Sequence, residues 1–101
     1  MARLPTPPGA NAGALALPAR MDSRAAPGLA EALRAAPPGP LRLDATGVRL
    51  LGGLCLQLLL AAARERGPDL VIAGLGAETV SQLAVFGLAP ADIAPGGVLS
   101  A

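Results

Sequence analysis

An uncharged run between Arg49 and Arg64 places the strongest constraint on how this chain can fold. The run reads LLGGLCLQLLLAAA over fourteen residues, with two glycines near its start and Gln57 inside it. A helix that crosses a membrane needs about 20 predominantly apolar residues, so this run is too short for that role. It predicts a buried helix over residues 53–66, closed by the Gly-Pro pair at 67–68, and no direct membrane insertion.

The composition predicts one small domain with an aliphatic core. The chain has 101 residues, of which 52% are hydrophobic, but Phe86 is its only aromatic residue. Its core must therefore be built from Leu, Val, Ile and Ala. All eight basic residues are arginines, spread from Arg3 to Arg66 against seven acidic residues. Without a basic cluster or an aromatic stacking surface, we expect no binding to nucleic acid.

Strands alternate with helices in the expected order of elements. The predicted strands cover residues 13–19, 41–46 and 69–75. The first predicted helix has Asp22 or Ser23 as its N-cap, and the other two cover residues 53–66 and 77–88. The third strand is fully apolar, which is typical of the centre of a covered parallel sheet. Residues 1–12 are expected to form a flexible tail before a single domain over 13–101, and residues 89–101 show little pattern. The alternation indicates an α/β layered domain.

The residue types that support most catalysis are missing from the chain. It contains no His, Tyr, Trp or Lys. A hydroxyl or thiol nucleophile would therefore lack an imidazole base, and no set of metal ligands is evident. Cys55 is the only cysteine, so no internal disulfide can form; its apolar surroundings favour a buried side chain over a reactive thiol. We expect no enzyme activity, no metal and no cofactor.

Two further features bear on function. Gly74 and Gly76 form a lone Gly-x-Gly between a predicted strand and a predicted helix, which leaves nucleotide binding as an open alternative to an ordinary tight turn. The N-terminal stretch MARLPTPPGANAG lacks the continuous apolar segment of a secretory signal. We therefore expect a cytoplasmic location.

Three blocks of sequence together resemble a STAS domain, the fold shared by sulfate-transporter C-terminal regions and anti-sigma-factor antagonists. The blocks are LPARMDSRAAPGLAEAL, LRLDATGVRLLGGLCLQLLLAAARERG and DLVIAGLGAETVSQLAVFGL, and they cover about residues 13–92. Their order and spacing carry the resemblance. It implies a mixed, mainly parallel sheet of about four strands, with helices packed largely on one face.

The sequence departs from the phosphorylatable members of that family at the start of the second helix. Those members carry Asp-Ser-Ser-Gly or Asp-Thr-Ala-Gly there, and the hydroxyl is modified by a partner kinase. The four positions correspond here to Gly52, Gly53, Leu54 and Cys55. The phosphoacceptor position is thus occupied by Leu54, which has no hydroxyl. Thr46 and Ser23 are interpreted as turn and cap residues, with the alternative that one of them is a substitute acceptor.

Helical spacing separates an outward stripe of the second helix from an inward one. The outward stripe is Leu54, Gln57, Ala61 and Arg64, and the inward stripe is Cys55, Leu56, Leu59 and Ala63. In STAS proteins this end of the helix and its preceding loop face the partner. The resemblance therefore implies a partner-binding set of Asp22, Thr46, Arg49, Leu51, Gly52, Gly53, Leu54 and Gln57. With Leu50 and Leu51, Leu54 forms either a small docking patch or a lone exposed leucine.

These features predict an adaptor that regulates a protein partner by binding it, without a phosphorylation switch. The resemblance implies a bacterial signalling role, like that of anti-sigma-factor antagonists or chemotaxis-associated regulators, with a kinase or a signalling scaffold as partner. The alternative is the STAS subunit of a phospholipid-asymmetry ABC transporter, with the transporter ATPase as partner.

Overall fold

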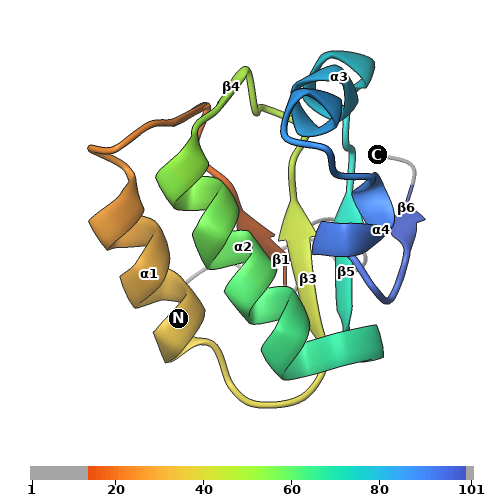
Figure 1. Cartoon of the computed structure of the whole chain (residues 1–101). Helices are drawn as coiled ribbons and strands as arrows, with labels where there is room; N and C mark the ends of the chain where they lie inside the picture. The colour runs from red at the N-terminus through yellow and green to blue at the C-terminus, as the bar shows by residue number, and fades with distance from the viewer. Residues whose placement is uncertain (1–13, 100–101) are drawn as a thin grey trace, which may run out of the picture.

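A four-stranded sheet forms the centre of the domain (Figure 1). Its order is β1 (Ala14–Ala16), β3 (Leu41–Asp44), β5 (Leu70–Ala73) and β6 (Val98–Leu99), and all three neighbouring pairs run parallel. A second sheet pairs β2 (Arg20–Met21) with β4 (Leu50–Leu51), also in parallel. The computed structural model describes residues 14–99. The tail predicted at 1–12 lies outside these residues. A mixed sheet was predicted, but all pairs of described strands are parallel.

The helices lie largely on one face of the sheet, as predicted (Figure 1). Figure 1 shows α1 (Ala26–Ala35), α2 (Gly53–Arg66) and α4 (Pro90–Ile93) in front of the strands, with α3 (Ala77–Val85) beyond the carboxyl ends of β3 and β5. A short 3-10 helix, η1 (Gly67–Asp69), joins α2 to β5. The bounds of α2 agree with the predicted helix over 53–66. The α/β architecture expected of a STAS-like domain is confirmed.

Alternation along the strands explains which side chains enter the core. In β3, Leu41 and Leu43 are buried, whereas Arg42 and Asp44 are only half-buried because they point to the face without helices. The β5 strand lies between β3 and β6, and this central position explains its fully apolar sequence. The inward stripe of α2 packs on these strands, since Cys55, Leu56, Leu59 and Ala63 are all buried. No aromatic ring enters this core, and Phe86 is exposed.

The three predicted strands are longer than the observed β1, β3 and β5, and two further segments differ from the prediction. The third helix ends at Val85 rather than at residue 88, because the Gly87 N–H donates to the Ala84 carbonyl and the Leu88 N–H to the Leu83 carbonyl. The segment 89–101, expected to lack pattern, contains α4 and β6. The α4 helix is capped by the Asp92 carboxylate, which accepts the Ala89 N–H at 2.7 Å. Elements this short show no hydrophobic periodicity, so they form because of their contacts with the rest of the fold.

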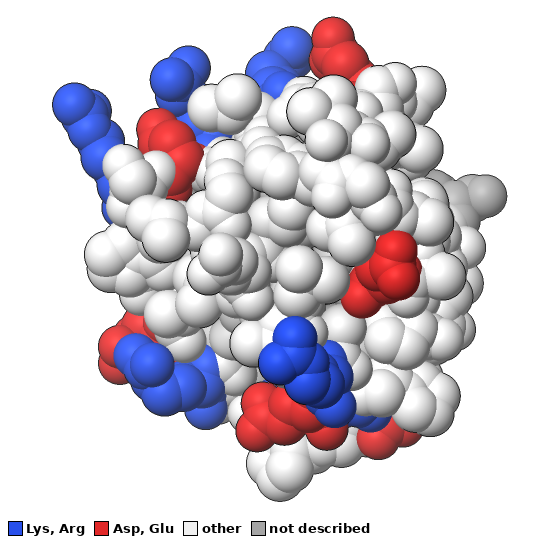
Figure 2. Space-filling model, viewed as in Figure 1, with Lys and Arg blue, Asp and Glu red and all other residues white. Residues whose placement is uncertain are grey.

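Charged side chains avoid the centre of the helix-covered face (Figure 2). The space-filling view shows acidic and basic groups mainly around the margin and a broad uncharged surface between them. Large exposed apolar side chains of the described residues are Leu50, Leu54, Val85, Phe86, Val98 and Leu99. The first two lie on β4 and at the start of α2, where the partner-binding residues were predicted.

Candidate protein-docking site

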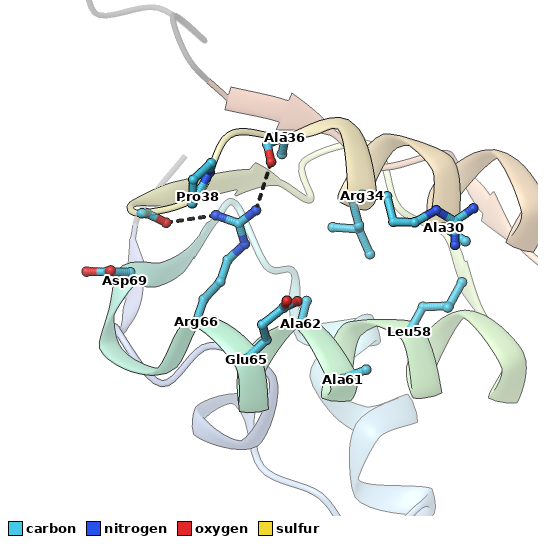
Figure 3. A pocket seen from close by; sticks show the side chains of 12 residues that line it. Ala30, Arg34, Ala36, Pro38, Leu58, Ala61, Ala62, Glu65, Arg66 and Asp69 are labelled. Atoms are coloured by element: carbon cyan, nitrogen blue, oxygen red, sulfur yellow. Dashed lines mark hydrogen bonds between the residues drawn. The ribbon is translucent and has the colours of Figure 1, made fainter.

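A groove lies between α1 and α2 (Figure 3). Both arginines that line it have partners within the chain. The Arg66 guanidinium donates to the carbonyls of Ala36, Pro37 and Gly39 at 3.3, 2.9 and 2.8 Å, which fixes the loop after α1. Arg34 pairs with Glu31 at 3.2 Å. Within residues 14–99, no three His, Cys, Asp or Glu side chains are placed to hold a metal. The groove is also lined by the carboxylates of Glu65 and Asp69.

Two chain segments meet where α2 begins. Arg20 pairs with Leu50 and Met21 with Leu51 in the small parallel sheet. The pairing continues one residue further, because the Gly52 N–H donates to the Met21 carbonyl at 2.8 Å. It brings the segment after β2 against the start of α2. The loops that follow β2 and β4 are thereby held side by side.

Gly52 and Gly53 have opposite surroundings at this junction. A Cβ on Gly52 would lie 2.8 Å from the Met21 carbonyl oxygen, whereas a Cβ on Gly53 would meet nothing within 4 Å. Gly52 is therefore explained by the close approach of two backbones. No side chain caps the start of α2, and its first turn carries no acidic residue. The structure gives Gly53 no comparable packing role.

Replacing each glycine by alanine is expected to change stability in opposite directions. Gly52→Ala should lower the free energy of unfolding by about 1–3 kcal/mol, because the backbone of Met21 has to move. Gly53→Ala should raise it by up to about 1 kcal/mol, since alanine loses less entropy on entering a helix. Urea unfolding of both variants checks this, and an equal effect of the two substitutions would contradict the close approach at Gly52.

The outward stripe of α2 is confirmed. The Leu54 side chain is 56% exposed, and Gln57, Ala61 and Arg64 are exposed along the same helix. The structure thus puts an apolar side chain in contact with solvent at the position that the family resemblance assigns to the phosphoacceptor. Leu50, 38% exposed, lies just before it on β4.

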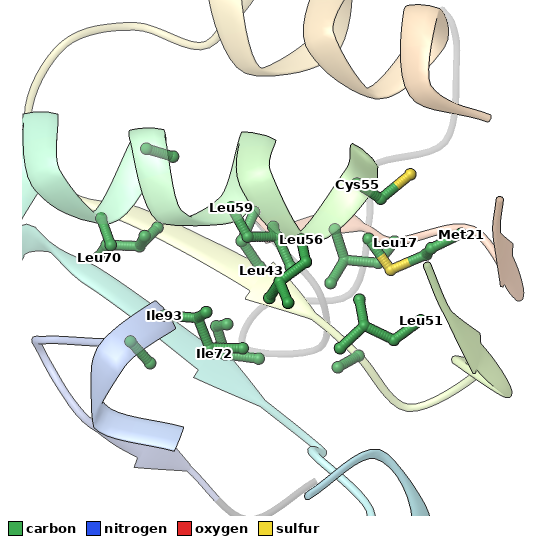
Figure 4. Close-up of a cluster of buried hydrophobic side chains, with 14 of the residues drawn as sticks. Leu17, Met21, Leu43, Leu51, Cys55, Leu56, Leu59, Leu70, Ile72 and Ile93 are labelled. Carbon is green, nitrogen blue, oxygen red and sulfur yellow. The ribbon is translucent and has the colours of Figure 1, made fainter. Parts of the chain in front are cut away.

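Leu51 does not belong to this surface. It was predicted to bind a partner, but it is only 4% exposed and packs beside Leu17 and Met21 in the core (Figure 4). The reason is strand alternation: Leu50 and Leu51 are neighbours in β4 and point to opposite sides. We therefore define the docking surface as Leu50, Gly53, Leu54 and Gln57.

Asp22 lies beside the docking surface and has a structural role. Its Oδ1 accepts the N–H groups of Arg24 and Ala25, both at 3.1 Å, and so caps the turn that leads into α1. Its Oδ2 lies 3.6 Å from Nε of Arg20. The prediction of Asp22 or Ser23 as the N-cap of the first helix is wrong, because the N-cap of α1 is Ala25, which makes no side-chain capping bond. Asp22 caps the preceding turn instead, and Ser23 is exposed.

Cys55 is fully buried on the opposite side of α2 from this surface (Figure 4), which confirms its predicted burial. Its Sγ donates to the Asp22 carbonyl at 3.4 Å. Burial, and to a smaller extent the negative charge of Asp22, raises the pKa of the Cys55 thiol. The reactive thiolate is thus disfavoured by both access and charge.

We expect a thiol reagent to label native Cys55 far more slowly than the unfolded chain. Burial blocks access and the raised pKa lowers the thiolate fraction at neutral pH. The labelling rates of the native and the unfolded chain are measured at neutral pH, without and with denaturant, by the absorbance of the coloured thiolate that the reagent releases. Similar rates in the two states would show that the thiol is accessible, and Cys55→Ser controls for reagent consumed elsewhere.

Thr46 lies at the carboxyl end of β3 rather than in the docking surface. Its hydroxyl and its N–H both donate to Oδ1 of Asp44, the N–H at 3.0 Å. These bonds, the hydroxyl first, hold the pKa of Asp44 below its ordinary value. A Cβ on Gly74 would lie 2.7 Å from Oγ1 of Thr46, so Gly74 is explained by this close packing. The turn therefore accounts for the first glycine of the Gly-x-Gly without a nucleotide.

Asp44 should make stability depend on pH in acid. Because its folded pKa is depressed, it stabilises the fold above the unfolded pKa of about 3.9, and this contribution is lost as pH falls through the folded pKa. Thr46→Val removes the hydroxyl bond and brings the folded pKa closer to the unfolded one. The Asp44 carboxyl should then titrate at higher pH by NMR, and less stability should be lost between about pH 5 and 3. An unchanged titration would contradict this role of the hydroxyl.

Gln82 is a residue of this region that sequence reasoning missed. Its Oε1 accepts the Leu51 N–H at 2.8 Å, and its Nε2 donates to the Arg49 carbonyl at 3.2 Å. These bonds tie α3 to β4 and so hold Leu50 and Arg49 in place. The available signal was a single amide side chain within the apolar stretch TVSQLAV.

One of three comparisons with known proteins found a match. A sequence model of a protein family described as "Mlab, STAS domain" matches residues 8–94 of the chain. No curated protein and no solved structure gave a significant match. In the part of the chain that the structure describes, no helix has the length and apolar character needed to span a bilayer.

Proposed function

The chain belongs to the STAS domain family, and on that premise we propose that it regulates a protein partner by binding it through the docking surface, without a phosphorylation switch. The observation that carries this proposal is the exposure of Leu54 at the start of α2. An apolar side chain there favours contact with another protein, and it supplies no oxygen to accept a phosphoryl group. Gln57 continues the surface by one helical turn.

A binding role also fits the chemistry of the domain. STAS domains are generally binding and regulatory modules rather than enzymes. Arg66 of the α1–α2 groove holds a loop, and the buried Cys55 thiol has a raised pKa. We propose that the domain has no catalytic activity of its own and works in the cytoplasm.

The first partner class is a signalling kinase or scaffold in a bacterial cell, as for anti-sigma-factor antagonists or chemotaxis-associated regulators. The second is the ATPase of a phospholipid-asymmetry transporter, with this chain as its STAS subunit. The description of the matched family, which names Mlab, favours this second candidate. Purification of the partner separates the two classes, because its sequence shows whether it is a kinase, a scaffold or a transporter ATPase.

The proposal is tested by reconstitution with that partner. The tagged chain is used to recover the partner from the source cell, the partner is purified alone, and binding is measured with the two pure proteins. We expect direct binding that a serine kinase and ATP leave unchanged, with no phosphate on the chain by mass spectrometry. Phosphate on Thr46 or Ser23 that alters binding would contradict the absence of a switch, and loss of binding between the pure proteins would contradict direct regulation.

A further inference from the structure

Arginine side chains border the docking surface on one side. Arg20 pairs in register with Leu50, and Arg49 directly precedes Leu50 in the chain. Arg24 lies two residues after Asp22. The backbone of Asp22 is close to the start of α2, because its α-carbon would lie 3.6 Å from a Cβ on Gly52. All three arginines are exposed. Figure 2 shows basic side chains together with acidic ones along this margin of the uncharged face.

Two of these three arginines form no ion pair with another described residue. Arg20 has Asp22 at 3.6 Å, but within the described residues neither Arg24 nor Arg49 has a carboxylate within 4.0 Å. The α3 helix carries one acidic residue, Glu78, in its first turn. The α2 helix begins here without an acidic residue in its first turn, so the positive end of its dipole adds to the same charge.

We propose that the partner segment seated on the docking surface is acidic and apolar: a protein segment with an apolar side chain against Leu50 and Leu54 and carboxylates facing Arg24 and Arg49. Charge complementarity favours this occupant, because cations left unpaired around an apolar centre attract an anionic rim and repel a basic one. The apolar centre favours a protein segment over nucleic acid, whose backbone has nothing to place against two leucines. This inference rests on the proposed function and names the chemistry of the partner.

The test uses synthetic peptides as probes for the full-length chain. One helical peptide carries a leucine stripe flanked by glutamates, a second carries the same stripe flanked by lysines, and a third keeps the glutamates but replaces the leucines by serine. Binding is followed by NMR of the nitrogen-15-labelled chain. We expect only the first peptide to bind, with shifts centred on Leu50, Gly53 and Leu54, and weaker binding as salt rises.

Charge variants make the test specific. The double variant Arg24→Ser with Arg49→Ser should bind the acidic peptide about tenfold more weakly. The control, Arg34→Ser with Arg64→Ser, removes two exposed arginines away from the start of α2 and should bind as the wild type does. Equal binding of the glutamate and lysine peptides at Leu54 would overturn the inference and leave the proposed function standing.

Three other outcomes also overturn it. Binding of none of the peptides would do so, as would shifts centred on another part of the fold. A self-association that Leu54→Glu abolishes would identify a second copy of the chain as the occupant instead. The proposed function fails separately, when the purified native partner binds the Leu54→Glu variant as tightly as the wild type.

Discussion

Leu54→Glu is expected to leave the fold intact and to weaken partner binding about a hundredfold, which corresponds to about 2.7 kcal/mol. Leu54 is 56% exposed, so a charged side chain there stays in water in the free protein. At the start of α2 a carboxylate meets the positive end of the helix dipole, and stability should hold or rise by up to about 1 kcal/mol. In the complex the same carboxylate is forced into an apolar contact without a partner.

Val85→Glu supplies the matched control. Val85 is 84% exposed on α3 and lies outside the docking surface, so this variant adds the same charge at another exposed apolar position. It should bind the partner as the wild type does. Thermal melting and titration calorimetry measure both effects on both variants. A Leu54→Glu protein that melts normally and binds normally would exclude Leu54 from the interface.

Leu59→Ala is expected to cost about 2–5 kcal/mol of unfolding free energy. Leu59 is 1% exposed and lies on the inward stripe of α2, against the sheet (Figure 4). Alanine there leaves a cavity in the core. For a domain of this size each 1 kcal/mol lowers Tm by about 4–8 °C, so Tm should fall by about 8 °C or more.

The neighbouring Leu58 is the control for this substitution. It is half-buried and lines the open groove between α1 and α2. Leu58→Ala removes the same atoms from a site that water can reach, so its cost should be clearly smaller. Urea unfolding of the two variants compares them directly. Equal costs would contradict the assignment of Leu59 to the core and Leu58 to the groove.

The sequence was informative where local signals and periodicity agreed. The second helix is bounded by glycines and a proline, and its predicted range 53–66 is the range of α2. Its inward and outward stripes were also correct, because a helix buried on one face sorts its side chains with a fixed period. The exposure of Leu54 followed from that period.

The remaining features depend on contacts that no local pattern records. The short strands β2 and β4 exist because they pair with each other, and β6 because it adds to β5. Leu51 was placed in the partner-binding set for the same reason, since without β4 there was no alternation to show that it is buried. Gln82 joins α3 to β4 across 31 residues of sequence. Its role could not be read from the helix in which it lies.

The most direct test of the central claim is amide hydrogen exchange on the chain, free and in complex with its purified partner. If the docking surface is the interface, binding should protect the amides around Leu50, Gly53 and Leu54 and leave those lining the α1–α2 groove unchanged. Protection confined to that groove or to the strand face without helices, with no change at the start of α2, would contradict the account.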